Sequence, residues 1–248
     1  MCVLILHHRT RPDASLVLLH NRDEDYDRAF DSPRLLEAGT GIVAPRDRQA
    51  GGTWIGVNRW GLVAAILNRT EEPPPDEVRS RGLLVFDALR AHSATSALEM
   101  LRTHLAHIAY AGFNLCLADG EKAFVIRHRG APVPRPLTGD DVFEFFPGAY
   151  VLTNLHEPGS VPLPEAARPD PGEPLEATLD RLEALAGDAS IRLPGGHRIL
   201  KRSRRRGTVC SVLLAPPRMR FAPGPPDRTP FETIPLLVGA RRPAAPDG

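Results

Sequence analysis

Cysteine is scarce in this chain, and the sequence has no long apolar run. Cys2, Cys116 and Cys210 are far apart and odd in number, so they form neither a metal-ligand spacing nor a disulfide framework. This usage favours a reducing compartment. No stretch approaches the roughly 18 apolar residues that a membrane helix needs, and the first apolar run ends at His7, too early for a signal peptide. We therefore expect a soluble, cytoplasmic protein with no membrane span.

An excess of charge of one sign is also missing. The 31 lysines and arginines nearly balance 30 aspartates and glutamates, which argues against a general nucleic-acid binder. One basic run does occur, and its cations are Arg198, Lys201, Arg202, Arg204, Arg205 and Arg206. Such a run can bind phosphate groups, but no aromatic residues interleave with it to stack bases. We interpret the run as a solvated loop that enters a strand, and we expect no nucleic-acid partner.

The apolar pattern predicts a layered α+β domain. Strands are expected at 2–7, 16–20, 41–44, 53–57, 62–67, 113–118, 122–128, 149–153, 208–215 and 219–221, with a loop around Ser32-Pro33. Helices are expected at 81–91, after a proline break at 73–75, then from a possible capping box at Ser96 and Glu99, and at 175–186. Because strands and helices do not alternate regularly, a doubly wound sheet is disfavoured. We assign 1–238 to a single domain and 239–248 to a flexible tail rich in proline and alanine.

The most reactive candidate residue is Cys2. If Met1 is removed, Cys2 carries a thiol and a free α-amine, which together are a nucleophile and a proton acceptor. These two groups titrate near ~8.5 and ~8, close to neutral pH. The alternative is that Cys2 is a small buried hydrophobe at the edge of a core strand.

Polar residues follow the neighbouring predicted strand. If Arg22 lies beside the thiol, its positive charge lowers the thiol pKa, and Asp23 can hold the amine or orient Arg22. The alternative is that the stretch from Asn21 to Glu24 is a charged loop that closes a hairpin.

Two asparagines, Asn68 and Asn154, each end an apolar strand. An asparagine amide in such a place can donate to a developing oxyanion and stabilise the transition state by about 3 kcal/mol. The alternative is that each is an ordinary turn residue. Glycines around Trp54 can shape the floor of a pocket, because they allow close backbone approach.

Taken together, these motifs resemble the NRDE family, also called the transport and Golgi organization protein 2 family. The matching motifs are Met1-Cys2, Asn21-Arg22-Asp23-Glu24, the stretch from Pro45 to Val57, Gly61 and the strand that ends in Asn68, with Leu152-Thr153-Asn154 similar in order. The resemblance implies a fold of the N-terminal-nucleophile hydrolase type, which is a four-layer αββα sandwich. More distantly, the chain is similar to choloylglycine hydrolases and penicillin acylases.

The resemblance also implies roles for individual residues. Cys2 would be the nucleophile, Arg22 its neighbour and Asp23 the nearby acid, a place that Glu24 could take instead. Asn68 and Asn154 would fill the two asparagine positions. In the last core strand the family usually has a Gly-Thr-Arg-Ser-Ser-like stretch, and here the nearest arginine, Arg206, is displaced. We add Asn21, Glu24, Trp54 and Arg206 as substrate-binding candidates, and we expect no metal and no cofactor.

Two functions follow from this interpretation. The first is hydrolysis of an amide bond, or acyl transfer, through a thioester on Cys2, with a small N-acyl or amide substrate. The second is a haem or lipid binding and trafficking protein on the same scaffold, because members of the resembled family have been connected with haem mobilisation and lipid homeostasis. Haem would be its ligand and would use Cys2, His7, His8 or His20. A scaffold with no small-molecule site is the third alternative.

Overall fold

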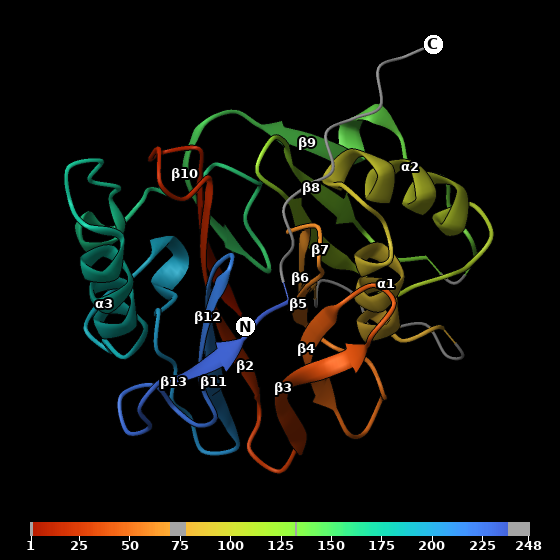
Figure 1. The fold of residues 1–248 in the computed structure, drawn as a ribbon. Coiled ribbons are helices and arrows are strands. Elements are labelled where there is room, and N and C mark those ends of the chain that lie inside the picture. The colour runs from red at the N-terminus through yellow and green to blue at the C-terminus, as the bar shows by residue number, and fades with distance from the viewer. Residues whose placement is uncertain (1, 70–77, 132, 238–248) are drawn as a thin grey trace.

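Two antiparallel sheets lie face to face in the computed structural model, with helices on both outer faces (Figure 1). The structure describes residues 2–69, 78–131 and 133–237. The expected proline break at 73–75 and the expected tail at 239–248 lie outside the described residues. Together the layers form the four-layer αββα sandwich of the predicted α+β class.

The first sheet holds both ends of the described chain. Its strands, in the order β10-β1-β2-β11-β12-β13, are β1 (Val3–His8), β2 (Leu16–Asp25), β10 (Gly148–Thr153), β11 (Arg206–Ala215), β12 (Arg218–Ala222) and β13 (Glu232–Pro235). Helix α3 (Leu175–Ala186) covers its outer face, on the left of Figure 1. Since β1 lies between α3 and the second sheet, all six of its residues are buried.

The second sheet follows the order of the chain. Its strands are β3 (Phe30–Glu37), β4 (Ile42–Asp47), β5 (Ile55–Val57), β6 (Val63–Asn68), β7 (Phe113–Ala118), β8 (Ala123–His128) and β9 (Val142–Phe145). Helices α1 (Arg81–Leu89) and α2 (Ala94–Leu105) cover its outer face, on the right of Figure 1. Short 3-10 turns occur at Gly139–Asp141, Glu165–Ala167 and Pro194–Gly196.

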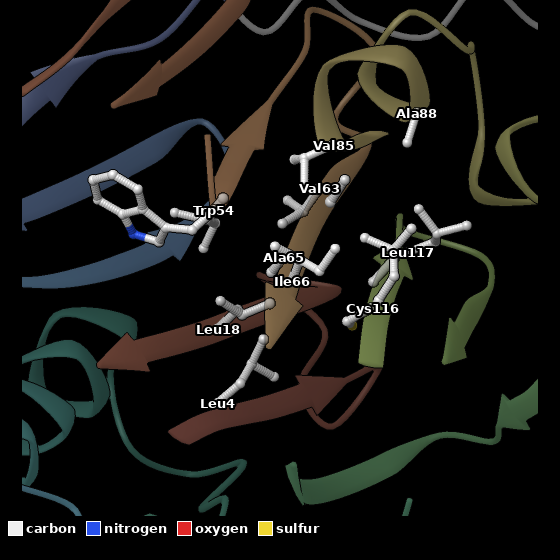
Figure 2. Close-up of a cluster of buried hydrophobic side chains, with 14 of the residues drawn as sticks. Leu4, Leu18, Trp54, Val63, Ala65, Ile66, Val85, Ala88, Cys116 and Leu117 are labelled. Carbon is white, nitrogen blue, oxygen red and sulfur yellow. The ribbon is translucent and has the colours of Figure 1, made fainter. Parts of the chain in front are cut away.

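Alternation along the strands divides the core into two layers. Leu4 and Leu6 of β1 join the cluster between the sheets, whereas Val3 and Ile5 pack toward α3. Figure 2 shows Leu4 and Leu18 near Ile66 of β6, with Val85 of α1 on the other side of that strand. The cluster between the sheets continues beneath α1 and α2, and it thus holds both sheets and two helices together.

Several elements differ from the sequence-based expectation. β3 occupies the segment around Ser32-Pro33 where a loop was expected, and β9 and β13 were not expected. α2 begins at Ala94 and is capped by Ser93, whose hydroxyl accepts the N–H of Ser96 at 3.1 Å. The predicted capping box at Ser96 and Glu99 was therefore wrong by one turn, since Ser96 is the third helical residue and closes the real box with Ser93.

The helices are short. α2 and α3 each have 12 residues. Across residues 2–69, 78–131 and 133–237, none is long and apolar enough to cross a membrane.

Candidate active site

A polar cleft of about 200 Å³ lies where β1 begins and where β2, β4 and β6 end. The N-terminus of α1 forms its far wall. Its charged lining consists of Arg22, Arg28, Arg79 and Arg81 on the cationic side and Asp23, Glu24 and Asp47 on the anionic side. The cleft therefore joins both sheets and the first helix.

Cys2 lies in the cleft wall immediately before β1. Its side chain is 8% exposed, and Sγ accepts the main-chain N–H of Asp23 at 3.4 Å. This contact follows from strand pairing, because Val3 of β1 lies opposite Asn21 of β2. Burial, and then the Asp23 carboxylate, raise the pKa of the Cys2 thiol to about 11. With Met1 attached, the sulfur is thus a thiol at neutral pH.

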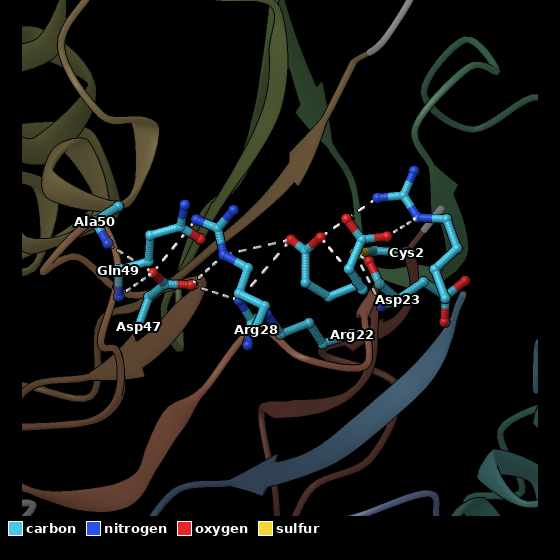
Figure 3. Close-up of polar contacts among 10 residues, drawn as sticks. Cys2, Arg22, Asp23, Arg28, Asp47, Gln49 and Ala50 are labelled. Carbon is cyan, nitrogen blue, oxygen red and sulfur yellow. Dashed lines mark hydrogen bonds and ion pairs between the residues drawn. The ribbon is translucent and has the colours of Figure 1, made fainter.

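The Arg22 guanidinium is fixed from two sides. It donates to Asp47 Oδ2 at 2.6 Å and stacks 4.0 Å from the centre of the Trp54 ring. Figure 3 shows Asp47 between two arginines, Arg22 and Arg28, and the turn that carries Gln49 and Ala50. Arg22 is 5% exposed, so its orientation is set by buried groups rather than by solvent.

Asp47 is the acceptor that holds this arrangement. Besides Arg22 it accepts from Arg28 Nε at 2.7 Å and from the N–H groups of Gln49 and Ala50 at 3.1 and 2.8 Å. Burial alone would raise the pKa of Asp47, but the hydrogen bonds from Arg28 and Ala50 lower it overall. Asp47 therefore remains a carboxylate across the neutral range.

The two acidic residues of β2 have different surroundings. Asp23 Oδ1 accepts the hydroxyl of Thr208 at 2.7 Å, and burial raises the pKa of the Asp23 carboxyl. Glu24 is half-buried and accepts from Arg206 at 3.3 Å. Arg206 is exposed and also contacts Asp25 at 3.1 Å, so it lies at the outer rim, beyond the residues that line the cleft.

The two asparagines meet across the sheets. Asn68 ends β6 and lines the cleft. Asn154 follows β10 in the other sheet, and its Nδ2 donates to the main-chain oxygen of Asn68. Nearby, Asn114 Nδ2 of β7 donates to Thr153 O at 2.8 Å. Within the described part of the chain, Asn154 Oδ1 is buried and has no hydrogen-bond partner.

Asn21, expected to bind substrate, lies on the opposite face of its sheet. Its Nδ2 donates to the main-chain oxygens of Ala186 and Ile199, each at 3.0 Å, and its Oδ1 accepts from Ser211 at 2.7 Å. These contacts tie the end of α3 to β2 and β11. Asn21 therefore has a structural role, whereas Cys2, Arg22, Asp23, Glu24, Trp54 and Asn68 share the cleft.

Four further charged residues of the cleft were not selected from the sequence. Asp47 was part of the family motif, and this resemblance was the signal that could have identified it. The spacing of Arg28, Arg79 and Arg81 did not predict a place in the cleft. The turn after β2 positions Arg28, and the start of α1 positions Arg79 and Arg81. Burial, and then the charge of Arg28, lower the pKa of Arg81.

The histidines considered for haem binding are buried outside the cleft lining. His7 and His8 are in β1, and His7 Nε2 bonds the main-chain oxygen of Ala167 at 2.7 Å. His20 is fully buried in β2, and burial lowers its pKa to about 3. None of the three has an accessible ring nitrogen for a haem iron. Across the described segments, no three potential metal-ligating side chains gather.

The comparison of sequences decides the family. The profile described as "Transport and Golgi organisation 2" matches residues 1–166. The chain belongs to this family. It is 30% identical to the Transport and Golgi organization 2 homolog of Mus musculus over an alignment of 171 residues, which covers 62% of this chain and 57% of that protein. It is also 30% identical over 166 residues to the Homo sapiens homolog, with the same coverage. The matches thus span little more than half the length of these relatives.

Solved structures share the architecture. Penicillin V acylase from Agrobacterium tumefaciens has a TM-score of 0.55 and 14% identity, with 89% of this chain and 82% of that chain covered. The Caenorhabditis elegans ortholog of N-acylethanolamine-hydrolyzing acid amidase has a TM-score of 0.52 and 12% identity, with coverage of 94% and 100%. A mutant of the conjugated bile acid hydrolase from Clostridium perfringens has a TM-score of 0.52 and 11% identity, with coverage of 99% and 100%. The fold is therefore N-terminal-nucleophile hydrolase-like, as the family resemblance implied.

Proposed function

We propose that this protein forms a thioester on Cys2 and acts as an amidohydrolase or acyltransferase on small N-acyl substrates. The observation that carries the proposal is the place of the Cys2 sulfur. It lies in the wall of a polar cleft, beside the main chain of Asp23, where the first strand of an N-terminal-nucleophile hydrolase-like fold begins.

The first half of the reaction forms the thioester. With Met1 removed, the α-amine of Cys2 accepts the thiol proton, and the sulfur attacks the substrate carbonyl carbon. The carbonyl oxygen becomes an oxyanion, to which Asn68 and the remaining amide N–H of Asn154 donate. Collapse of the intermediate breaks the C–N bond. The proton passes from the Cys2 amine to the leaving amine, and the acyl group stays on sulfur.

The second half of the reaction frees the enzyme. Water in a hydrolase, or an acceptor amine in a transferase, loses a proton to the Cys2 amine and attacks the thioester carbonyl. The C–S bond then breaks, and the sulfur recovers its proton. Acid and base are thus the same amine throughout, and no cofactor is required.

The charged neighbours tune and orient these groups. Arg22 favours the thiolate by its positive charge, and its ion pair with Asp47 and its stack on Trp54 keep it in place. Asp23 holds the liberated amine. Glu24 contacts substrate at the mouth of the cleft, and Arg206 supports Glu24 from the rim.

Intact-mass spectrometry tests the proposal. Protein with a free Cys2 amine is incubated with a panel of activated N-acyl substrates, and we expect a mass increase equal to the acyl group. The adduct should disappear in Cys2→Ala and persist in Cys116→Ala, a matched loss of another buried cysteine. Equal labelling of Cys2→Ala, or retention of Met1 in protein purified from its native host, would overturn the mechanism.

The alternative proposal, haem or lipid binding on the same scaffold, predicts a different result. It requires haem to bind with a Soret shift that depends on Cys2 or on a histidine. Titration of the wild type, of Cys2→Ala and of a variant of each candidate histidine tests the proposal, because a wild type that gives no Soret shift excludes haem binding. A shift that is the same in the wild type and in Cys2→Ala excludes Cys2 as a haem ligand.

A further inference from the structure

Two of the residues that line the cleft carry buried hydrogen-bond donors without acceptors among the described residues. Arg22 and Trp54 are only 5% and 6% exposed, and both line the cleft. Arg22 Nη1 and Trp54 Nε1 are buried, and no described residue accepts a hydrogen bond from either. Because buried donors in native proteins are almost always paired, both atoms indicate an acceptor that comes from a ligand.

Arg81 adds a cation to the same cleft. Its Nη1 donates to the main-chain oxygen of Gly112 at 2.8 Å, and within the described segments it has no carboxylate partner. The nearby acids are engaged elsewhere, since Asp47 binds two arginines and Glu24 binds Arg206. The positive charge of Arg81 is therefore not neutralised by an ion pair.

The first turn of α1 faces the cleft as well. Ser80, Arg81 and Gly82 line it, the Ser80 side chain makes no capping bond, and the first turn contains no acidic residue. The close approach of Gly52 to Gly82 fixes this turn, and the Thr53 N–H donates to Gly82 O at 3.0 Å. Free N–H groups and the helix dipole at such an end favour negative charge.

We propose that the cleft binds the anionic group of a ligand, a carboxylate or a phosphate. Arg81 and the first turn of α1 supply the main contacts, and Arg22 Nη1 and Trp54 Nε1 supply further donors. The inference rests on the proposed function for one point. If Cys2 cleaves amides, the preferred substrates are N-acyl amides that carry an acid group within reach of Arg81.

Equilibrium binding to the Cys2→Ala variant tests the site without catalysis. The probes share one acyl chain and differ in the amine part: N-dodecanoylglycine carries a carboxylate, N-dodecanoyl-O-phosphoethanolamine a phosphate, and N-dodecanoylethanolamine no charge. Calorimetry should show at least about 10-fold tighter binding of one anionic probe than of the neutral probe. The tighter anionic probe identifies which of the two groups the site prefers.

Variants of Arg81, the first residue of α1, and of Arg90, which directly follows the helix, locate the site. Arg81→Met, made in the Cys2→Ala background, should reduce the preference to about 2-fold, and Arg81→Lys should keep part of it, since the charge remains. Arg90→Met is the matched control, because Arg90 is exposed, pairs with Glu37 and lies outside the cleft. It should leave the preference unchanged.

The outcomes separate this inference from the proposed function. Equal binding of all three probes, no binding of any probe, or a preference that survives Arg81→Met overturns the anion site. If the preference is present but wild-type protein never forms an acyl adduct, the proposed reaction fails and the anion site stands. If wild-type protein forms an acyl adduct but the anionic and neutral probes bind equally, the anion site fails and the proposed reaction stands.

Discussion

The side chains that line the cleft are held in position by contacts with other residues. Arg22 is placed by Asp47 and Trp54, and Asp47 is in turn placed by the turn at Gln49 and Ala50. The sequence identified Arg22 because it follows the strand beside Cys2. Asp47 lay within the matching stretch from Pro45 to Val57, but its partner could not be predicted, since no local pattern says which carboxylate a distant arginine will meet.

The exclusion of Asn21 has a simple physical cause. Successive residues of a strand face opposite sides of the sheet. Because β2 continues to Asp25, Asn21 and Arg22 are strand residues that point in opposite directions rather than members of one loop. The expectation grouped them because the strand was expected to end at residue 20.

The reactivity of Cys2 should depend steeply on pH. In protein that keeps Met1, the pKa of about 11 leaves the thiol protonated at pH 8, with a thiolate fraction of about one part in a thousand. The rate of alkylation by iodoacetamide, followed by peptide mass spectrometry, should rise up to about pH 11. In urea-unfolded protein the rise should centre near 8.5. A plateau below pH 9 in the folded protein would contradict this burial argument.

At the scale of elements, the sequence predicted the interior better than the edges. α3 and β7 were predicted with their observed bounds, because each has an uninterrupted apolar pattern. The unexpected strands β3, β9 and β13 all lie at sheet edges, and most of their residues are half-buried or exposed. Pro33 suggested a loop, yet an edge strand tolerates proline.

The contact between α1 and the Gly51-Gly52 turn gives a prediction about packing. A Cβ on Gly52 would lie 2.4 Å from the carbonyl carbon of Gly82. Gly52→Ala should therefore push α1 away and lower the free energy of unfolding by about 1–3 kcal/mol. Gly39→Ala is the control, because a Cβ there meets nothing within 4 Å. Urea denaturation measures both, and equal midpoints would show that the helix yields without cost.

At the scale of the whole molecule, buried histidines predict acid sensitivity. Burial lowers the pKa of His20 to about 3 and that of His128 to about 4. The unfolded chain, with histidine pKa near 6.5, therefore binds these protons first, and stability falls as the pH drops from about 6.5 toward 3–4. The protein's free energy of unfolding should therefore decline through this window.

His20→Leu should remove part of that decline. Between pH 7 and pH 5 the loss of unfolding free energy should be smaller than in the wild type by about 2 kcal/mol, since one buried proton acceptor is gone. Urea titrations at both pH values measure the difference. His107→Gln, which changes an exposed histidine on the loop after α2, should leave the decline as it is. An unchanged decline in His20→Leu would exclude His20 as a cause.

Three polar contacts cross from one sheet to the other beside Cys2: Arg22 with Asp47, Asn154 with Asn68, and Asn114 with Thr153. The leucine and alanine layers behind them attract without direction. These contacts thus fix the spacing between the two sheets, of which the first carries the Cys2 sulfur and the second carries α1. Removing any one of these contacts would therefore change the position of Cys2 relative to α1, although none of the contacts involves Cys2 or α1 itself.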